Sequence, residues 1–434
     1  MNYSTLFNWT ERKLNLPKRL ENVTVAYLLF LMVSTRKHTL QAAAEFSNLS
    51  KSRFSKLLKN HSGLAVTKLC ELSKKQARQF GRNIGFMADG KLPWKIAIII
   101  DATLQNRSSL HAQNVQKFNH GKGYRIGHQW TNIVLFINDL LIPLPPIEFY
   151  TKAYCRKNKI PYRTEHQRVV QYLADLDLEQ YIGPHEPKQV LVLGDSGYDD
   201  KKIEKTISDK GWTYVIALKN KRSIKTLKEY TDTPKSTGWH QIEQFFKNHR
   251  RIKWITVFLP QNSPKEKRTE VRVRQITGFL RNVGKAQLIC SEMKQRRKQR
   301  RKHFACNDLK ANLRQILSAY RIRWKIELFH KKIKMFFGFE DVATKSFDSV
   351  ISHVHWLYCA YILLHSHPPG IPKTLKSIEE KQQLIEASCK NKQISSILQL
   401  MSQFNGVDRL KNKLREALEA PMAQQNLILS GVEL

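Results

Sequence analysis

The chain has 434 residues, enough for about three domains with a buried core. Hydrophobic residues make up 41% and charged residues 25%, a composition that excludes a disordered or fibrous chain. The 74 Lys and Arg residues against 36 Asp and Glu give a net charge of +38, so we expect a polyanionic partner, either nucleic acid or an anionic membrane surface.

No membrane span or signal peptide is expected. The longest apolar runs, Val23–Val33 and Trp356–Leu364, are about half of the roughly 20 residues that cross a bilayer. The first residues lack a basic segment followed by an apolar one. The six cysteines lie far apart without a CxxC pair, which favours buried thiols in the cytoplasm over disulfides or a zinc site.

Residues 1–88 are expected to be helical and basic. Within them, 42–59 favours two helices joined by a short turn, with Ser50 as the N-cap of the second helix. Basic side chains then face outward near the start of that helix, where a helix-turn-helix contacts DNA. These DNA-binding candidates are Lys51, Arg53 and Lys56. The alternative is an ordinary helical hairpin with a solvated basic face.

Short β-branched runs alternate with helical patterns from residue 89 onward. Strands are expected at 95–100, 131–137, 140–144, 189–193 and 213–218, and helices at 165–181 and 199–209. The second and third strands flank Asn138 and Asp139, a two-residue hairpin connection. An antiparallel hairpin followed by βα units predicts a mixed sheet with helices on its faces.

Residues 222–305 have a different texture, with alternating candidate strands and then the basic run 294–303, in which Lys and Arg fill seven of ten places. We expect a β-rich insertion closed by a basic loop that contacts DNA, the alternative being a loop that is only solvated. The arginines of this run are Arg296, Arg297, Arg300 and Arg301. A long helix is predicted over 307–337. The expected division is a helical DNA-binding domain at 1–88, a core at 89–221 and 306–370, the insertion at 222–305, and a helical region at 371–434.

Two acids follow strands whose carboxyl ends meet if the strands are parallel neighbours: Asp101 and Asp195. Asp139 does not qualify, because its hairpin lies at the opposite end of the sheet. A third acid, Glu327, lies on the long helix. Four polar residues precede or follow Glu327 at spacings of three or four, so that all five side chains lie within an arc of about 80° around the helix axis. The other members of this face are Tyr320, Arg323, Lys331 and Lys334, and the apolar residues expected to pack around the helix are Trp324, Leu328, Phe329, Ile333, Phe336 and Phe337.

Three converging carboxylates repel one another unless a cation lies between them. Mg²⁺ and Mn²⁺ prefer oxygen ligands and also bind phosphate. Two such ions, about 3.5–4 Å apart, activate a water or a 3′-hydroxyl and stabilise the leaving oxygen of a displacement at phosphorus. The cations around Glu327 would hold the phosphodiester backbone.

The long helix carries a series similar to the YREK signature of DDE transposases from bacterial insertion sequences: Tyr320-x₂-Arg323-x₃-Glu327-x₆-Lys334. Asp101 after an apolar strand and Asp195 in LGDSGYD match the first two acidic positions of that family, and the insertion before Glu327 also matches. The resemblance spans about 90–340. It implies an α/β fold, a ribonuclease-H-like mixed sheet with flanking helices and a β-rich insertion, to which helical N- and C-terminal regions are added.

The resemblance implies cut-and-paste transposition. The protein would bind terminal inverted repeats of double-stranded DNA as a homodimer in a synaptic complex, cleave both strands and join the 3′-hydroxyl to target DNA, in the bacterial cytoplasm at the nucleoid. In the family three acids bind two Mg²⁺ or Mn²⁺ ions, and the resemblance implies the same metal-binding role for Asp101, Asp195 and Glu327. It likewise implies that Tyr320, Arg323 and Lys334 contact DNA phosphates near the cut end.

Some relatives stack a flipped base on an aromatic residue of the insertion, and Trp254 lies in that region without matching a motif. His330 is expected to be a packing or phosphate-side residue, and Asp199 and Asp200 to begin a helix, where negative charge suits the dipole. Two other functions stay open. One is a ribonuclease-H-like nuclease that cuts without joining, which only the resemblance disfavours. The other is a former transposase that only binds DNA, which the intact acids disfavour.

Overall fold

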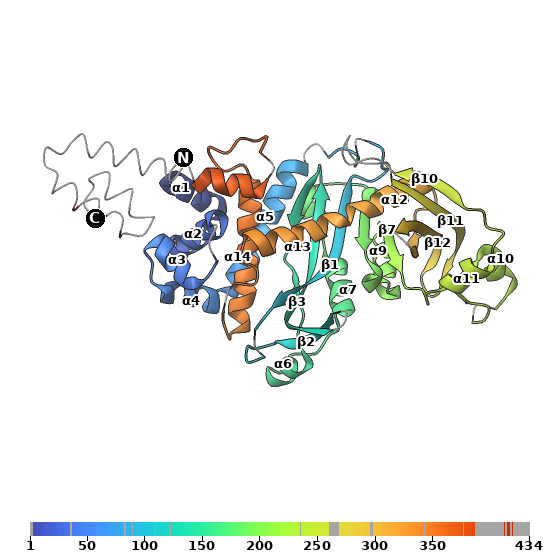
Figure 1. The fold of residues 1–434 in the computed structure, drawn as a ribbon, viewed down its shortest axis with the longest axis horizontal. Coiled ribbons are helices and arrows are strands. Elements are labelled where there is room, and N and C mark those ends of the chain that lie inside the picture. Colours follow the sequence, from blue (N-terminus) through green and yellow to red (C-terminus); the bar gives the residue numbers. More distant parts are fainter. Residues whose placement is uncertain are drawn as a thin grey trace.

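The computed structural model describes residues 3–386 apart from 35–36, 82–83, 89, 109, 121–122, 235, 260–268, 296–297, 342 and 376, together with 412, 415–416 and 419. The molecule is elongated, with the N-terminal helices at one end, the sheet in the middle and the insertion at the other end (Figure 1). Of the predicted C-terminal helical region, 378–386 are helical, and most of the rest lies outside the described residues. In the described part of the chain, no helix is long and apolar enough to span a membrane.

The N-terminal region is helical, as predicted: α1 (Tyr3–Leu14), α2 (Lys18–Val33), α3 (Leu40–Ser47), α4 (Lys51–Asn60) and α5 (Ser62–Gly81). The expected helix pair is α3 and α4, joined where Asn48 takes a left-handed φ of 57°. Ser50 holds the N-cap position of α4, but its hydroxyl contacts Ser52 Oγ and not a backbone N–H, so the predicted capping bond is wrong. Helices α2, α4 and α5 pack on α14 (Phe347–His365).

One sheet runs through the core and the insertion, and in the residues that the structure describes it has thirteen strands. The core strands are β1 (Ile96–Asn106), β2 (Gln116–His120), β3 (Gly123–Ile137), β4 (Leu140–Pro143), β5 (Ile147–Glu148), β6 (Val190–Gly194) and β7 (Thr213–Leu218). β1, β6 and β7 are parallel, and β3 runs antiparallel to β1. The predicted mixed sheet with flanking helices is therefore confirmed, as is the hairpin at Asn138 and Asp139, whose φ values of 46° and 64° are both positive.

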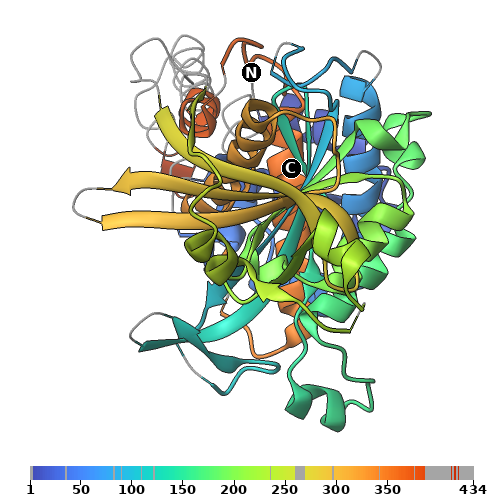
Figure 2. The same ribbon diagram turned by 90° about the vertical axis from the view of Figure 1, so that its right-hand side faces the viewer.

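The insertion extends the core sheet. It contains β8 (Ser223–Thr226), α10 (Leu227–Asp232), β9 (His240–Gln241), α11 (Ile242–Asn248), β10 (Ile255–Leu259), β11 (Thr269–Leu280), β12 (Gly284–Gln295) and β13 (Lys298–Cys306). The predicted basic loop at 294–303 is wrong, because β12 and β13 pair there as a hairpin. This hairpin projects from the body (Figure 2), and a projecting hairpin needs no apolar face. β13 then pairs with β7, His303 opposite Leu218.

Side chains alternate between two hydrophobic cores along the central strands. Ala97 and Ile99 of β1 belong to the cluster of α13 (Trp324–Phe336) and α14. Their neighbours Ile96, Ile98 and Ile100 belong to the opposite cluster, with α7 (Glu165–Asp175) and α9 (Lys201–Asp209). Successive side chains of a strand point to opposite faces, and each aliphatic side chain buried in this way contributes about 1.5–3 kcal/mol. Helices α12 (Leu313–Ile322) and α13 cross one face of the sheet (Figure 1).

Two predicted helices are each divided in two. The helix expected at 165–181 is α7 and α8 (Glu179–Ile182), because Asp177 Oδ1 accepts a hydrogen bond from Glu179 N and begins a new helix. The helix expected at 307–337 begins only at α12, where Asn312 and Gln315 form a capping box, and it is interrupted at Arg323. The short elements α6 (Lys152–Lys157) and η1 (Pro187–Gln189) complete the core.

Candidate active site

The alternation of the central strands places two predicted acids on the face that α13 covers. Ile100 pairs with Gly194 in the parallel register of β1 and β6, so Asp101 and Asp195 come next side by side. Asp101 follows Ala97 and Ile99 on the α13 face. The prediction that Asp101 ends its strand is wrong, since β1 continues to Asn106. The parallel partner β6 does end at Gly194, and the two carboxylates therefore still meet at one strand end.

The loop after β6 fixes the Asp195 carboxylate. Asp195 is the N-cap of η2 (Ser196–Tyr198), and its Oδ1 accepts a hydrogen bond of 2.7 Å from Gly197 N. A Cβ atom at Gly197 would lie 2.8 Å from that same oxygen, so a larger residue at this position would displace the Asp195 carboxylate. Tyr198 then donates its hydroxyl to Glu165 at 2.9 Å, and Glu165 also accepts from Thr131 of β3. The loop is thus tied to both α7 and the sheet.

The third acid, Glu327, reaches the same place from α13 through Arg323. Arg323 Nη2 lies 2.5 Å from Glu327 Oε1, and Arg323 Nη1 lies 3.9 Å from Asp101 Oδ2. The pKa of Asp101 is raised to about 7, chiefly by burial; the charges of Asp195 and Glu327 also raise it, while Arg323 opposes them. The structure therefore brings Asp101 and Glu327 to one guanidinium, with Asp195 close enough for its charge to act on Asp101.

The chemistry of these donors fits a hard divalent cation. Carboxylate oxygens are the ligands that Mg²⁺ prefers, and the charges of Asp195 and Glu327 act with burial to disfavour a second and third negative charge beside Asp101 when no cation is bound. In the residues that the structure describes, no group of three or more His, Cys, Asp or Glu side chains is arranged to hold a metal ion. Here Arg323 supplies the positive charge beside Asp101 and Glu327.

A buried relay of hydrogen bonds behind Asp101 was not predicted from the sequence. Asn132 lies opposite Asp101 in the β1–β3 register and donates through Nδ2 to His330 Nε2 at 2.8 Å. Tyr358 of α14 donates its hydroxyl to Asn132 Oδ1. Because His330 Nε2 accepts, its Nδ1 carries the hydrogen and faces Asp101 Oδ2 at 3.9 Å. The sequence did carry one signal for it, the amide Asn132 within the otherwise mostly apolar predicted strand 131–137.

The other residues of the predicted helix face lie around this cluster. Tyr320 packs edge-on against Phe304, and Arg323 lies over its ring at 5.6 Å. Lys334 Nζ donates to the Leu104 carbonyl oxygen at 2.8 Å, while Lys331 is exposed. The predicted packing of Phe329, Ile333 and Phe337 is confirmed, and Phe336 is partly buried. It is wrong for Trp324 and Leu328, which are 57% and 41% exposed because they lie on the side of α13 away from the sheet.

The remaining predicted DNA contacts lie elsewhere. Lys51, Arg53 and Lys56 are exposed on α4, as expected. Arg296 and Arg297 lie outside the described residues, and so does the side chain of Arg300. Arg301 pairs with Glu292 at 3.1 Å and, with Arg272 and Arg274, surrounds the Trp254 ring at 4.4–5.7 Å. In this structure the ring of Trp254 therefore contacts guanidinium groups of the insertion.

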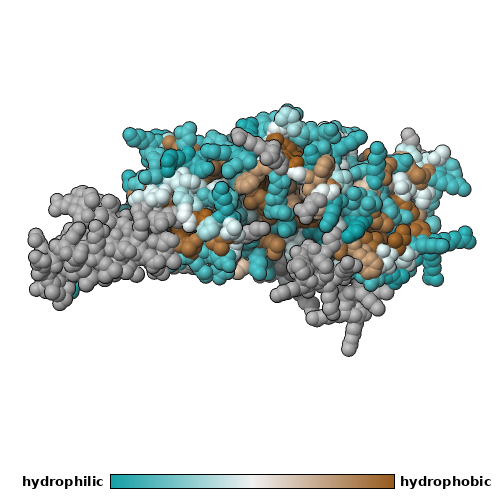
Figure 3. All heavy atoms as spheres, turned by 90° about the horizontal axis from the view of Figure 1, so that it is seen from above, coloured by the Kyte–Doolittle hydropathy of each residue, from teal (hydrophilic) through white to brown (hydrophobic). Residues whose placement is uncertain are grey.

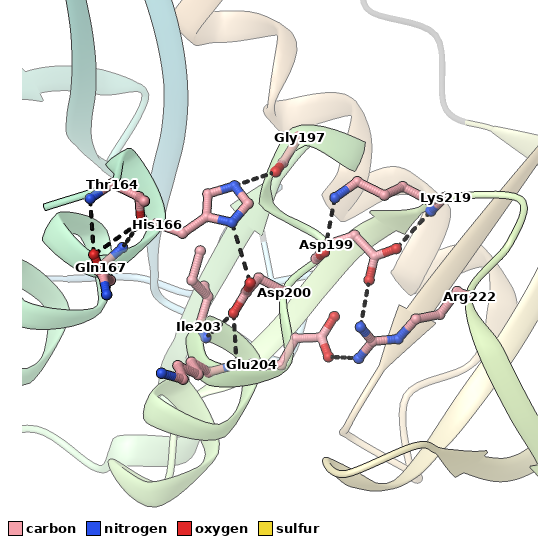
Figure 4. Close-up of polar contacts among 11 residues, drawn as sticks. Thr164, His166, Gln167, Gly197, Asp199, Asp200, Ile203, Glu204, Lys219 and Arg222 are labelled. Atoms are coloured by element: carbon pink, nitrogen blue, oxygen red, sulfur yellow. Dashed lines mark hydrogen bonds and ion pairs between the residues drawn. The ribbon is translucent and has the colours of Figure 1, made fainter. Parts of the chain in front are cut away.

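Asp199 and Asp200 differ in their roles (Figure 4). Asp200 is the N-cap of α9, as predicted, and accepts from Lys202 N at 2.8 Å. Asp199 does not cap the helix; it pairs with Arg222 at 3.2 Å and accepts from Lys219 N at 2.7 Å. The segment after Asp195 is thus joined to the connection between β7 and the insertion.

Comparison with known proteins gives one family. The model of the transposase DDE domain matches residues 163–363. The match includes Asp195, Glu327 and the whole insertion, and it begins after Asp101. A search of curated proteins found no match.

Proposed function

We propose that this chain, a member of the transposase DDE domain family by its match over residues 163–363, binds terminal inverted repeats and moves DNA by cut-and-paste transposition. The family carries out nuclease and transesterase chemistry and generally uses divalent metal. The observation that carries the proposal is the meeting of Asp101, Asp195 and Glu327, which lie far apart in the sequence, at the end of β6.

In this proposal the three carboxylates hold two Mg²⁺ or Mn²⁺ ions. When bound, the ions supply the positive charge that activates a water or 3′-hydroxyl oxygen and stabilises the leaving oxygen. Asp101 loses its proton on binding, and Arg323 leaves Asp101 and Glu327 for the DNA backbone. His330 N–H keeps the Asp101 carboxylate oriented, since Asn132 and Tyr358 fix the ring.

The YREK assignment gives the cations of α13 their roles. Arg323 and Lys334 contact phosphates near the cut end, with Tyr320 beside them. Lys334 supports this assignment because its bond to the Leu104 carbonyl holds the ammonium at the β1 strand, a few residues after Asp101. Lys331 extends the same basic face, and α4 with Lys51, Arg53 and Lys56 reads the inverted repeat.

Pairing of two DNA ends requires two copies of the chain, so we place a homodimer in the synaptic complex, acting at the nucleoid in the cytoplasm. Support for this part comes from the family resemblance and from the net charge of +38, which suits a DNA partner.

A cleavage and strand-transfer assay tests the proposal. A labelled duplex that carries the inverted repeat flanking the gene is incubated with the protein, target DNA and Mg²⁺. We expect cleavage at the repeat end and joined products from the wild type, and neither from Asp101→Asn, Asp195→Asn or Glu327→Gln. Cleavage without joining would assign a nuclease, and cleavage by the three variants would refute the site.

A further inference from the structure

A second cationic site lies where the core meets the insertion. A cavity of about 290 Å³ is lined by the start of α9, the β7–β8 connection and the β11–β12 turn. Five of its lining residues are cations, Lys201, Lys219, Lys221, Arg222 and Arg281, against the single acid Asp199. We call this cavity the junction pocket.

The inner wall of the junction pocket is fixed by hydrogen bonds and ion pairs (Figure 4). Arg222 contacts both the Asp199 carboxylate and the fully buried carboxyl group of Glu204. Lys219 Nζ donates to the Asp199 carbonyl oxygen at 3.2 Å, and its backbone N–H donates to the Asp199 carboxylate. These two cations are therefore held in place before any ligand arrives.

The outer wall carries unneutralised charge. Lys201, Lys221 and Arg281 are exposed, and no ion pair joins them to an acid in the described part of the chain. Ser223 and Asn282 add a hydroxyl and an amide as neutral donors. Ammonium and guanidinium groups converging with neutral donors match the oxygens of a phosphate.

The junction pocket is attached to the catalytic loop. Asp199, in its inner wall, follows Asp195 by four residues. On the other side of this loop, His166 contacts the Gly197 carbonyl oxygen at 2.8 Å and Asp200 at 3.2 Å (Figure 4). The loop is held from both sides, so a phosphate in the pocket lies at a fixed position relative to Asp195.

We propose that the junction pocket binds a backbone phosphate of the DNA substrate, beyond the phosphodiester that is cut. The proposal rests on the proposed function, which supplies the DNA. Neither the family match nor the helix series of Glu327 assigns these residues a role.

The test compares two double variants of the full chain. Lys221→Gln with Arg281→Gln removes two outer cations, both exposed and outside the catalytic cluster. Lys188→Gln with Lys205→Gln makes the same charge change on exposed residues outside the pocket. The dissociation constant for a repeat-end duplex is measured over a range of salt concentrations. Each phosphate contact contributes about 0.9 to the slope of log affinity against log salt.

We expect the pocket variant to lower the magnitude of that slope by about 0.9, the contribution of one lost phosphate contact, and the control variant and Lys221→Arg with Arg281→Lys to keep the wild-type slope. Equal slopes for the pocket and control variants would overturn the proposal. Calorimetry with inorganic phosphate tests whether the pocket instead binds a free anion. Loss of phosphate binding in the pocket variant, together with an unchanged salt slope for DNA, would assign a free-anion site and overturn the proposal. Cleavage by Asp195→Asn would refute the proposed function and leave this result standing.

Discussion

Arg323 Nη2 lies 2.5 Å from Oε1 of Glu327, one helical turn further along α13. The same guanidinium lies 3.9 Å from Asp101, so the positive charge that the carboxylates need is built into the helix that carries the third acid. Without a divalent ion, this arginine limits the repulsion among the acids.

We therefore expect Arg323→Gln to lower the melting temperature of the metal-free protein and to enlarge the rise in melting temperature on adding Mg²⁺. The reason is that the variant leaves Asp101 and Glu327 without a cation until the metal binds. Differential scanning fluorimetry across Mg²⁺ concentrations measures both effects, with Arg314→Gln on the exposed side of α12 as the matched control. An equal Mg²⁺ response in wild type and Arg323→Gln would contradict this role.

Tyr358→Phe tests the relay behind Asp101. The variant keeps the ring but leaves Asn132 Oδ1 without its donor in a buried site, which costs about 1–3 kcal/mol of unfolding free energy. Urea denaturation measures the change, and Tyr124→Phe, at a residue 59% exposed, serves as the reference. A difference below about 0.5 kcal/mol between the two variants would show that this hydrogen bond is unimportant.

Glu204→Gln tests the contacts of Asp199 and Glu204 with Arg222 through the pH dependence of the unfolding free energy. Burial, the largest cause, raises the pKa of Glu204 from 4.5 to about 9, and Asp199 raises it too. The folded protein thus holds a proton that the unfolded chain releases above pH 4.5, and this stabilising contribution is lost progressively as the pH rises through about 9. Relative to wild type, Glu204→Gln should gain unfolding free energy from pH 6 to pH 9. If the difference in unfolding free energy between wild type and Glu204→Gln did not change with pH, the carboxyl group of Glu204 would not hold this proton.

Replacement of Lys51, Arg53 and Lys56 by Gln tests the DNA role of α4. All three are exposed, so the fold should persist, and loss of up to three phosphate contacts should reduce the salt slope of binding to the repeat by up to about 3. Cleavage of a pre-nicked end at high protein concentration reports on the catalytic site separately. Unchanged affinity for the repeat would show that α4 is a solvated helix and that recognition lies elsewhere.

The local patterns of the sequence were sufficient to predict which acids lie close together, because strand alternation and helical spacing are properties of short segments. The meeting of Asp101 with Asp195 followed from the parallel strands, and β7 was predicted at its observed bounds. The partner of Asp101 across the sheet was out of reach, since Asn132 depends on the register of two strands about 30 residues apart in the chain.

Non-local pairing also explains the wrong prediction for the basic run. Its charge density predicted a loop, whereas β13 is held by backbone pairing with β7, more than 80 residues earlier. The junction pocket depends on the same long-range arrangement: Lys221 precedes β8 and Arg281 follows β11, and the antiparallel pairing of these two strands brings the residues to the same place. Neither residue stands out in the sequence of a chain with 74 Lys and Arg residues.

The most direct test of metal binding by the three acids is the metal preference of Asp195→Cys. A thiolate is a poor ligand for Mg²⁺ and a better one for Mn²⁺, so exchanging one ligand oxygen for sulfur changes which ion supports cleavage. We predict that wild type cleaves the repeat end with either ion, and that Asp195→Cys loses cleavage in Mg²⁺ and regains at least about tenfold in Mn²⁺. Cleavage by Asp195→Cys at the wild-type rate in Mg²⁺ would contradict the account.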